Sequence, residues 1–65
     1  MFIKYTMILG LPILLVRIKD RAAWFTNING NEYSGFLEVN DESESKVMNK
    51  LKEEAQESIK YYLNK

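Results

Sequence analysis

The chain has 65 residues, no cysteine, no histidine, and nine basic residues that balance nine acidic ones. This composition excludes a disulfide framework and lacks the usual zinc ligands, so a chain near the lower size limit must rely on packing or self-association. Zero net charge removes the simplest argument for nucleic-acid binding. We expect one small domain over residues 1–65, with no bound cofactor or metal.

Residues 5–16 form an almost continuous apolar run, YTMILGLPILLV. A membrane-spanning helix needs about 20 such residues, and no signal-peptide cleavage site follows the run. Gly10 and Pro12 divide it into two pieces of strand length, because glycine permits positive φ and proline withholds a backbone donor. The run therefore favours two buried strands, 2–9 and 13–19, over an export or membrane segment.

Asn29-Gly30 is the clearest local signal, since this dipeptide suits a type I′ turn between two paired strands. It joins predicted strands 22–28 and 31–39, and a two-residue turn fixes their register. The expected pairs are Ile28–Asn31, Thr26–Tyr33, Trp24–Gly35, Ala22–Leu37, Phe25–Ser34 and Ala23–Phe36. An indole can lie across the bare backbone of a glycine, so the Trp24–Gly35 pair is physically reasonable.

A helix is predicted over residues 42–64. Asp41 is a suitable N-cap, and Glu44 three residues later completes a capping-box pattern. The apolar positions then form one stripe: Val47, Met48, Leu51, Ala55, Ile59, Tyr62 and Leu63. The predicted fold class is α+β, a three- to four-stranded antiparallel meander followed by one C-terminal amphipathic helix packed on one face.

The strands carry more apolar side chains than one helix can cover. We expect Ile13, Leu15, Phe25 and Phe36 to lie opposite the helix-facing set. Monomers rarely expose large contiguous apolar patches, so this face would be covered by a second copy of the chain or by another protein. The alternative is a strongly twisted sheet whose first strand folds over and buries the excess.

Catalytic chemistry finds little support in the sequence. There is no cysteine nucleophile, and the serines lack a histidine to act as base. The carboxylate pairs, such as Glu42 and Glu44, lie in a polar run or on a predicted solvated helix face, whereas acid–base catalysis needs a shifted pKa. We expect the protein not to be an enzyme.

Two charged clusters have both a structural and a functional interpretation. Four acidic residues occur within seven positions: Glu38, Asp41, Glu42 and Glu44. They could serve helix capping and solubility, or could dock onto a basic protein surface. Three basic residues, Arg17, Lys19 and Arg21, could discourage edge aggregation, or could contact nucleic acid with Trp24, Phe25 or Tyr33 stacking on bases.

The segments Asn29-Gly30-Asn31-Glu32-Tyr33 and Glu42-Ser43-Glu44-Ser45, with the apolar helix after them, resemble small phage-encoded anti-CRISPR inhibitors. The resemblance covers about a third of the chain. It implies a partner that is a nuclease or another nucleic-acid-binding protein, contacted through Glu32, Glu38, Asp41, Glu42 and Glu44. The strand–strand–strand–helix order is also similar to HicB-like antitoxins and to the three-stranded DNA-binding domains of integrases.

The leading hypothesis is a small protein-binding or inhibitor module, encoded by a phage or mobile element, that covers a surface of a larger protein. We expect it in the cytoplasm, which is that of the host cell if the chain is phage-encoded. The second is a nucleic-acid-binding regulator or antitoxin-like protein that uses Arg17, Lys19 and Arg21. The third is a structural homo-oligomer, such as a homodimer.

Overall fold

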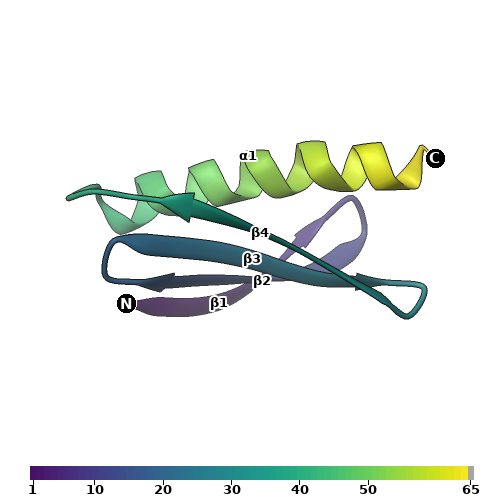
Figure 1. The fold of residues 1–65 in the computed structure, drawn as a ribbon, viewed down its shortest axis with the longest axis horizontal. Coiled ribbons are helices and arrows are strands. Elements are labelled where there is room, and N and C mark those ends of the chain that lie inside the picture. The colour runs from purple at the N-terminus through teal and green to yellow at the C-terminus, as the bar shows by residue number, and fades with distance from the viewer. Residues whose placement is uncertain (65) are drawn as a thin grey trace.

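The computed structural model describes residues 1–64 and has two layers, a four-stranded antiparallel sheet and one helix (Figure 1). The elements are β1 (Phe2–Ile8), β2 (Leu11–Ile18), β3 (Arg21–Ile28), β4 (Asn31–Glu38) and α1 (Glu44–Leu63). The strands follow one another across the sheet in chain order, so the sheet is a meander. This confirms the α+β prediction.

Three two-residue turns, spaced ten residues apart, connect the strands. Leu9 and Gly10 have φ of 53° and 80°, Lys19 has 56°, and Asn29 and Gly30 have 53° and 85°. Only the last turn has both residue types that tolerate this region well. There the Asn27 side-chain oxygen also accepts a hydrogen bond from Gly30 N, at 2.9 Å.

The second strand starts at Leu11, two residues before the predicted start at residue 13. Pro12 is inside β2, where its register partner is Met7 of β1. Pairing between β2 and β3 begins only at Leu14 and Phe25, so Pro12 lies in the part of β2 that pairs with β1 alone. Residues 5–16 form most of this hairpin, as the two-strand interpretation predicted. Among the described residues, no helix is long and apolar enough to cross a membrane.

The register predicted for the Asn29-Gly30 hairpin is confirmed at all six pairs. Trp24 opposes Gly35, and the indole ring lies so close to the glycine that a Cβ built there would contact ring atom Cε2 at 2.8 Å. The indole Nε1 is buried and finds no hydrogen-bond partner among residues 1–64. Gly35 is therefore a packing requirement for the central tryptophan.

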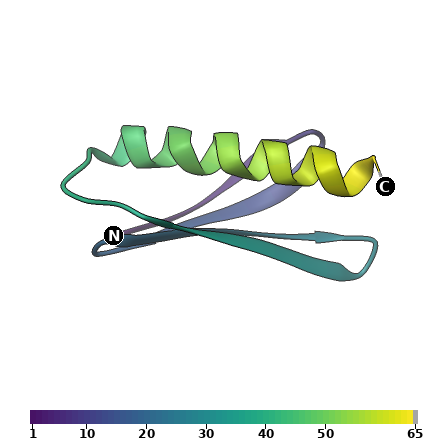
Figure 2. The same cartoon turned by 45° about the horizontal axis from the view of Figure 1, so that its top comes forward.

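The hydrophobic core lies between α1 and one face of the sheet, which we call the covered face. Helix residues Val47, Leu51, Ala55 and Ile59 are completely buried there. The sheet contributes Phe2, Ile8, Ile13, Leu15, Ala22 and Trp24, and Val39 beyond β4 completes the cluster. Figure 2 shows the helix on this side of the sheet, and no other helix or strand of residues 1–64 lies on the opposite side.

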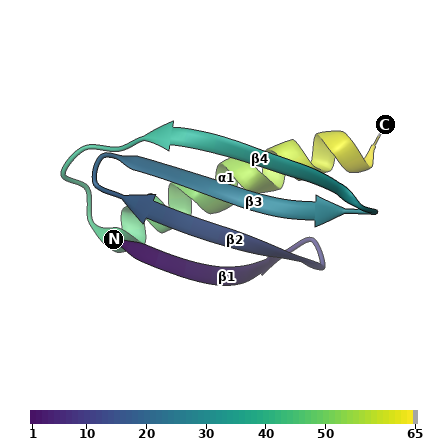
Figure 3. The same cartoon turned by 60° about the horizontal axis from the view of Figure 1, so that its bottom comes forward.

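The helix crosses the sheet diagonally, from the side of β1 to the side of β4 (Figure 3). At its start, the carboxylate of Glu44 lies 3.3 Å from Nζ of Lys4 on β1. At its end, Tyr62 stacks on Tyr33 of β4 with ring centroids 4.1 Å apart. Two edge contacts thus fix the direction in which the helix lies over the core.

The N-cap is Ser43, and the prediction that Asp41 caps the helix is wrong. The Ser43 hydroxyl accepts a hydrogen bond from Lys46 N, at 3.4 Å. Arg17 explains why the helix starts two residues later. Its guanidinium donates to the carbonyls of Asn40 at 3.0 Å and Glu42 at 2.8 Å, which holds this segment outside the helix.

Candidate binding surface

The side of the sheet that faces away from α1 is predominantly apolar, and we call it the open face. Its large members alternate along the strands with the core residues of the covered face. They are Ile3, Tyr5, Met7, Leu14, Val16, Ile18, Phe25 and Phe36. Figure 3 looks directly onto this face, across all four strands.

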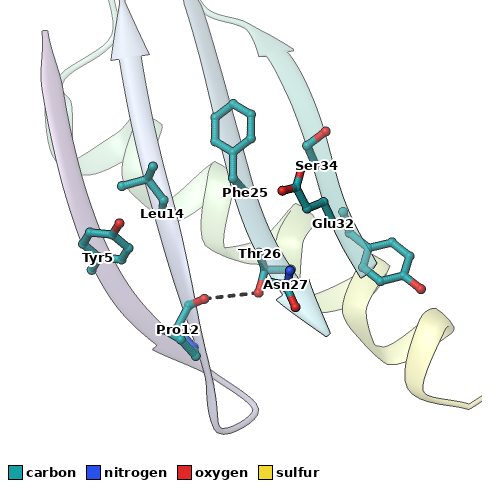
Figure 4. A pocket seen from close by; sticks show the side chains of 9 residues that line it. Tyr5, Pro12, Leu14, Phe25, Thr26, Asn27, Glu32 and Ser34 are labelled. Atoms are coloured by element: carbon teal, nitrogen blue, oxygen red, sulfur yellow. Dashed lines mark hydrogen bonds between the residues drawn. The ribbon is translucent and has the colours of Figure 1, made fainter. Parts of the chain in front are cut away.

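Register arranges the open face in rows that run across the sheet. The Ile3 row consists of Ile3, Val16, Ala23 and Phe36, and the Tyr5 row consists of Tyr5, Leu14, Phe25 and Ser34. Figure 4 shows the members of the Tyr5 row side by side on neighbouring strands. The surface is therefore continuous and its side chains are placed by the sheet.

Several of these side chains are far more exposed than apolar residues in a packed interior. The exposed fraction is 75% for Tyr5, 72% for Phe36, 65% for Met7 and 63% for Ile3. Contiguous apolar surface of this kind usually marks a protein–protein interface or a ligand-binding groove. β1 pairs with β2 along its whole length and leaves Ile3, Tyr5 and Met7 exposed, so the alternative in which the first strand folds over and buries the excess is wrong.

Phe25 separates two shallow hollows on the open face. One, of about 610 Å³, lies between Tyr5 and Ser34 and is drawn in Figure 4. Beneath it, the Thr26 hydroxyl donates to the Pro12 carbonyl at 3.1 Å, which closes the gap between β2 and β3. The other hollow, of about 450 Å³, lies between Val16 and Phe36. Ridges and hollows give the face a relief that a partner could match.

Two of the four residues predicted for this surface lie on it, and two do not. Phe25 and Phe36 are on the open face, where their rings meet edge to face with centroids 6.3 Å apart. Ile13 and Leu15 are completely buried under α1, so placing them opposite the helix was wrong. Their sequence neighbours Leu14 and Val16 alternate with them along β2 and therefore lie on the open face.

Arg17 is a charged residue on the covered side of β2, where its register partner is the core residue Phe2. Arg17 shares the parity of Ile13 and Leu15, and a charged residue suggests a solvent-facing side. In the structure its position near the end of β2 lets the side chain reach past the core and bind the segment before α1. The register indicates the correct face. Leu15 pairs with Trp24, and Trp24 is expected to be buried because it lies over Gly35.

The predicted acidic patch is not one surface. Glu32 is near one end of β4 and Glu38 is at the other, while Asp41 lies in the exposed segment beyond. Glu42 is bound by Nζ of Lys50 at 2.7 Å, and Glu44 by Nζ of Lys4 at 3.3 Å. Internal cations therefore compensate two of the five carboxylates.

The electrostatics of Glu42 follow from this contact. The hydrogen bond from Lys50 lowers the pKa of the Glu42 carboxyl below its ordinary value of 4.5. The positive charges of Lys50, Lys46 and Arg17 act in the same direction, and partial desolvation opposes them. Glu42 is thus a charged structural contact at the start of the helix.

The three basic residues are also dispersed. The guanidinium of Arg17 lies on the covered side and donates to three carbonyls, those of Asn40, Glu42 and Lys19. Lys19 occupies a turn, and Arg21 is on the open face opposite Glu38. The sequence cluster therefore does not form a shared basic surface.

Within residues 1–64, no three acidic side chains gather closely enough to hold a metal ion. Comparison of the chain with protein-family models, curated proteins and solved structures found no match. The resemblance to anti-CRISPR inhibitors accordingly stays a prediction, and the fold and the open face are the findings on which function can be argued.

Proposed function

We propose that this chain is a small protein-binding module that acts through its open face, and that it works by binding and not by catalysis. The observation that carries the proposal is the set of four apolar side chains, each more than 60% exposed, on one side of a sheet: Ile3, Tyr5, Met7 and Phe36.

The size of the open face suits a specific interface. The exposed fractions of its six most exposed side chains add up to between three and four whole residues. With ~200 Å² for a large apolar side chain, this is roughly 700 Å², close to the ~800 Å² that each partner contributes to a standard interface. Aromatic residues such as Tyr5 and Phe36 are the types enriched among energetically dominant contacts.

The open face is also preorganised. Most of its side chains are next in sequence to a core residue of the covered face, as Leu14 is next to Ile13 and Leu15. Binding would therefore order few main-chain degrees of freedom, which lowers the cost of association.

This proposal changes the surface that the sequence suggested for a partner. Neither the acidic nor the basic residues form a single patch, so they support no second function here. If the partner is a larger protein such as a nuclease, as the anti-CRISPR resemblance implies, we propose that the apolar open face contacts it first and that the carboxylates contribute at the rim.

Site-specific photo-crosslinking tests the proposal. A photoreactive phenylalanine analogue replaces Tyr5 in one variant and Tyr61 in a control, and both are activated in native cells. Tyr61 is a matched control because it is an aromatic side chain, 64% exposed, on the helix. We expect a discrete protein adduct from position 5 alone. No adduct at position 5, or equal adducts at both positions, would contradict the proposal.

A further inference from the structure

We propose that the open face is covered by a second copy of this chain, with the two sheets packed face to face and β1 of each copy over β4 of the other. This inference rests on the proposed protein-binding role of that face and names its partner.

The area is sufficient for such a dimer. Two open faces would together bury roughly 1,400 Å², within the ~1,200–2,000 Å² of stable, specific interfaces. The result would be a four-layer assembly, with a helix on each outside and the two sheets ~10 Å apart at its centre. It would also give a chain near the lower size limit a second hydrophobic core.

The relief of the open face fits a two-fold axis parallel to the strands. Such an axis places each row of one copy over the same row of the other copy. It also reverses the order of the strands, so that β1 of one copy lies over β4 of the other. As in every two-fold dimer, the interface is isologous. In the Tyr5 row, the protruding Tyr5 of one copy meets the small Ser34 of the other. In the Ile3 row, Ile3 meets Phe36, and both are strongly exposed in the single chain.

The positions of the charged residues also favour a two-fold axis parallel to the strands. A two-fold axis across the strands would place Glu32 over Glu38 of the other copy, twice, because these residues sit near opposite ends of β4. Like charges facing one another at an interface are costly. With the axis parallel to the strands, Glu32 meets Met7 at the rim, and Arg21 stays beside Glu38 of its own copy. The zero net charge of the chain adds no repulsion between copies.

Sedimentation equilibrium of the full chain is the first test. At about 100 μM, well above a micromolar Kd, we expect a mass twice the 7.6 kDa of the chain. The control Tyr61→Lys, which adds a charge on the helix, should keep the doubled mass. A wild-type mass of one chain would overturn the inference. A protein adduct of another mass at position 5 would then still support the proposed function.

A charge-swap pair tests the arrangement itself. Ile3→Lys with Phe36→Lys places two cations over each other in this dimer and should raise Kd at least ~100-fold, whereas Ile3→Lys with Phe36→Glu should recover at least ~10-fold of that loss. Both positions are exposed and lie on opposite edge strands, so both variants should show the same folded Trp24 fluorescence. Equal dissociation of the two variants, or no dissociation of either, would contradict the β1-over-β4 geometry.

Discussion

The two faces of the same sheet differ in what their side chains contact. On the covered face, Ile13, Leu15 and Trp24 are sealed under α1, whereas on the open face Tyr5 and Phe36 stay largely exposed. Sequence neighbours such as Leu14 and Leu15 are chemically identical, and only their parity in the strand separates them. The covered face accounts for folding, and the open face is surplus to it. Exposed apolar side chains that the fold does not need are typical of a binding surface.

The largest expected effect comes from the matched pair Leu15→Ala and Leu14→Ala. Leu15 is completely buried, so its truncation should cost about 3 kcal/mol in the free energy of unfolding, because it leaves a cavity. Leu14 is only partly buried, and its truncation should cost less than ~1 kcal/mol in the monomer. Urea unfolding followed by Trp24 fluorescence, at a protein concentration low enough for the chain to be monomeric, measures both. Similar losses for the two variants would remove the distinction between the faces.

Gly35→Ala should destabilise the fold by about 2 kcal/mol, since the added methyl group would overlap the indole of Trp24 and force it to shift. Ser34→Ala, one residue away on the open face, is the control and should change stability by less than ~0.5 kcal/mol. Thermal unfolding compares the variants at one concentration. A Gly35→Ala variant as stable as wild type would show that the tryptophan does not depend on the glycine.

Arg17→Ala should cost about 1.5 kcal/mol, because the chain loses charged hydrogen bonds to carbonyls of the segment before α1. Arg21→Ala removes the same side chain from the open face and should be nearly neutral in the monomer. Hydrogen exchange of the amides in residues 40–46 gives a local measurement. We expect faster exchange there in Arg17→Ala only, and unchanged exchange would contradict the anchoring role of Arg17.

The smallest effect is the pH dependence due to Glu42. Its pKa is lowered in the folded state, so its contribution to stability is present above the ordinary value of 4.5 and is lost as the pH falls through the lowered value. Glu42→Gln should therefore be less stable than wild type at neutral pH and equal to it in strong acid. Glu57→Gln, exposed on the helix, is the control. A gap between Glu42→Gln and wild type that persists unchanged in strong acid would exclude this linkage.

Much of the fold follows from local chemistry in the sequence. Asn29-Gly30 fixed one hairpin and its register, and the spacing of Val47, Leu51, Ala55 and Ile59 defined the buried stripe of the helix. Leu63, at the end of the predicted stripe, is half exposed because α1 ends there. The first hairpin was harder, because Leu9-Gly10 has only one residue suited to positive φ and Pro12 resembles a strand breaker.

The site was less predictable than the fold, because it depends on tertiary contacts. No local sequence signal shows that the guanidinium of Arg17 binds the carbonyls of Asn40 and Glu42. Because of this contact, the helix starts later than predicted and Arg17 lies on the covered face of β2. Likewise, the acidic residues are adjacent in sequence, but Lys50 and Lys4 compensate two of them from other elements. The sequence showed that the strands carry more apolar side chains than one helix can cover. Which side of the sheet stays exposed could be assigned only once the position of the helix was known.

Hydroxyl-radical footprinting of the unmodified chain in native cells tests the central claim most directly. In a free chain, Tyr5, Phe36 and Tyr61 would be similarly accessible to radicals, with exposed fractions of 75%, 72% and 64%. If the open face binds a protein, Tyr5 and Phe36 should be protected several-fold relative to the chain unfolded in denaturant, while Tyr61 remains reactive. Equal reactivity of all three side chains would show that the open face is bare, and would contradict a binding role for it.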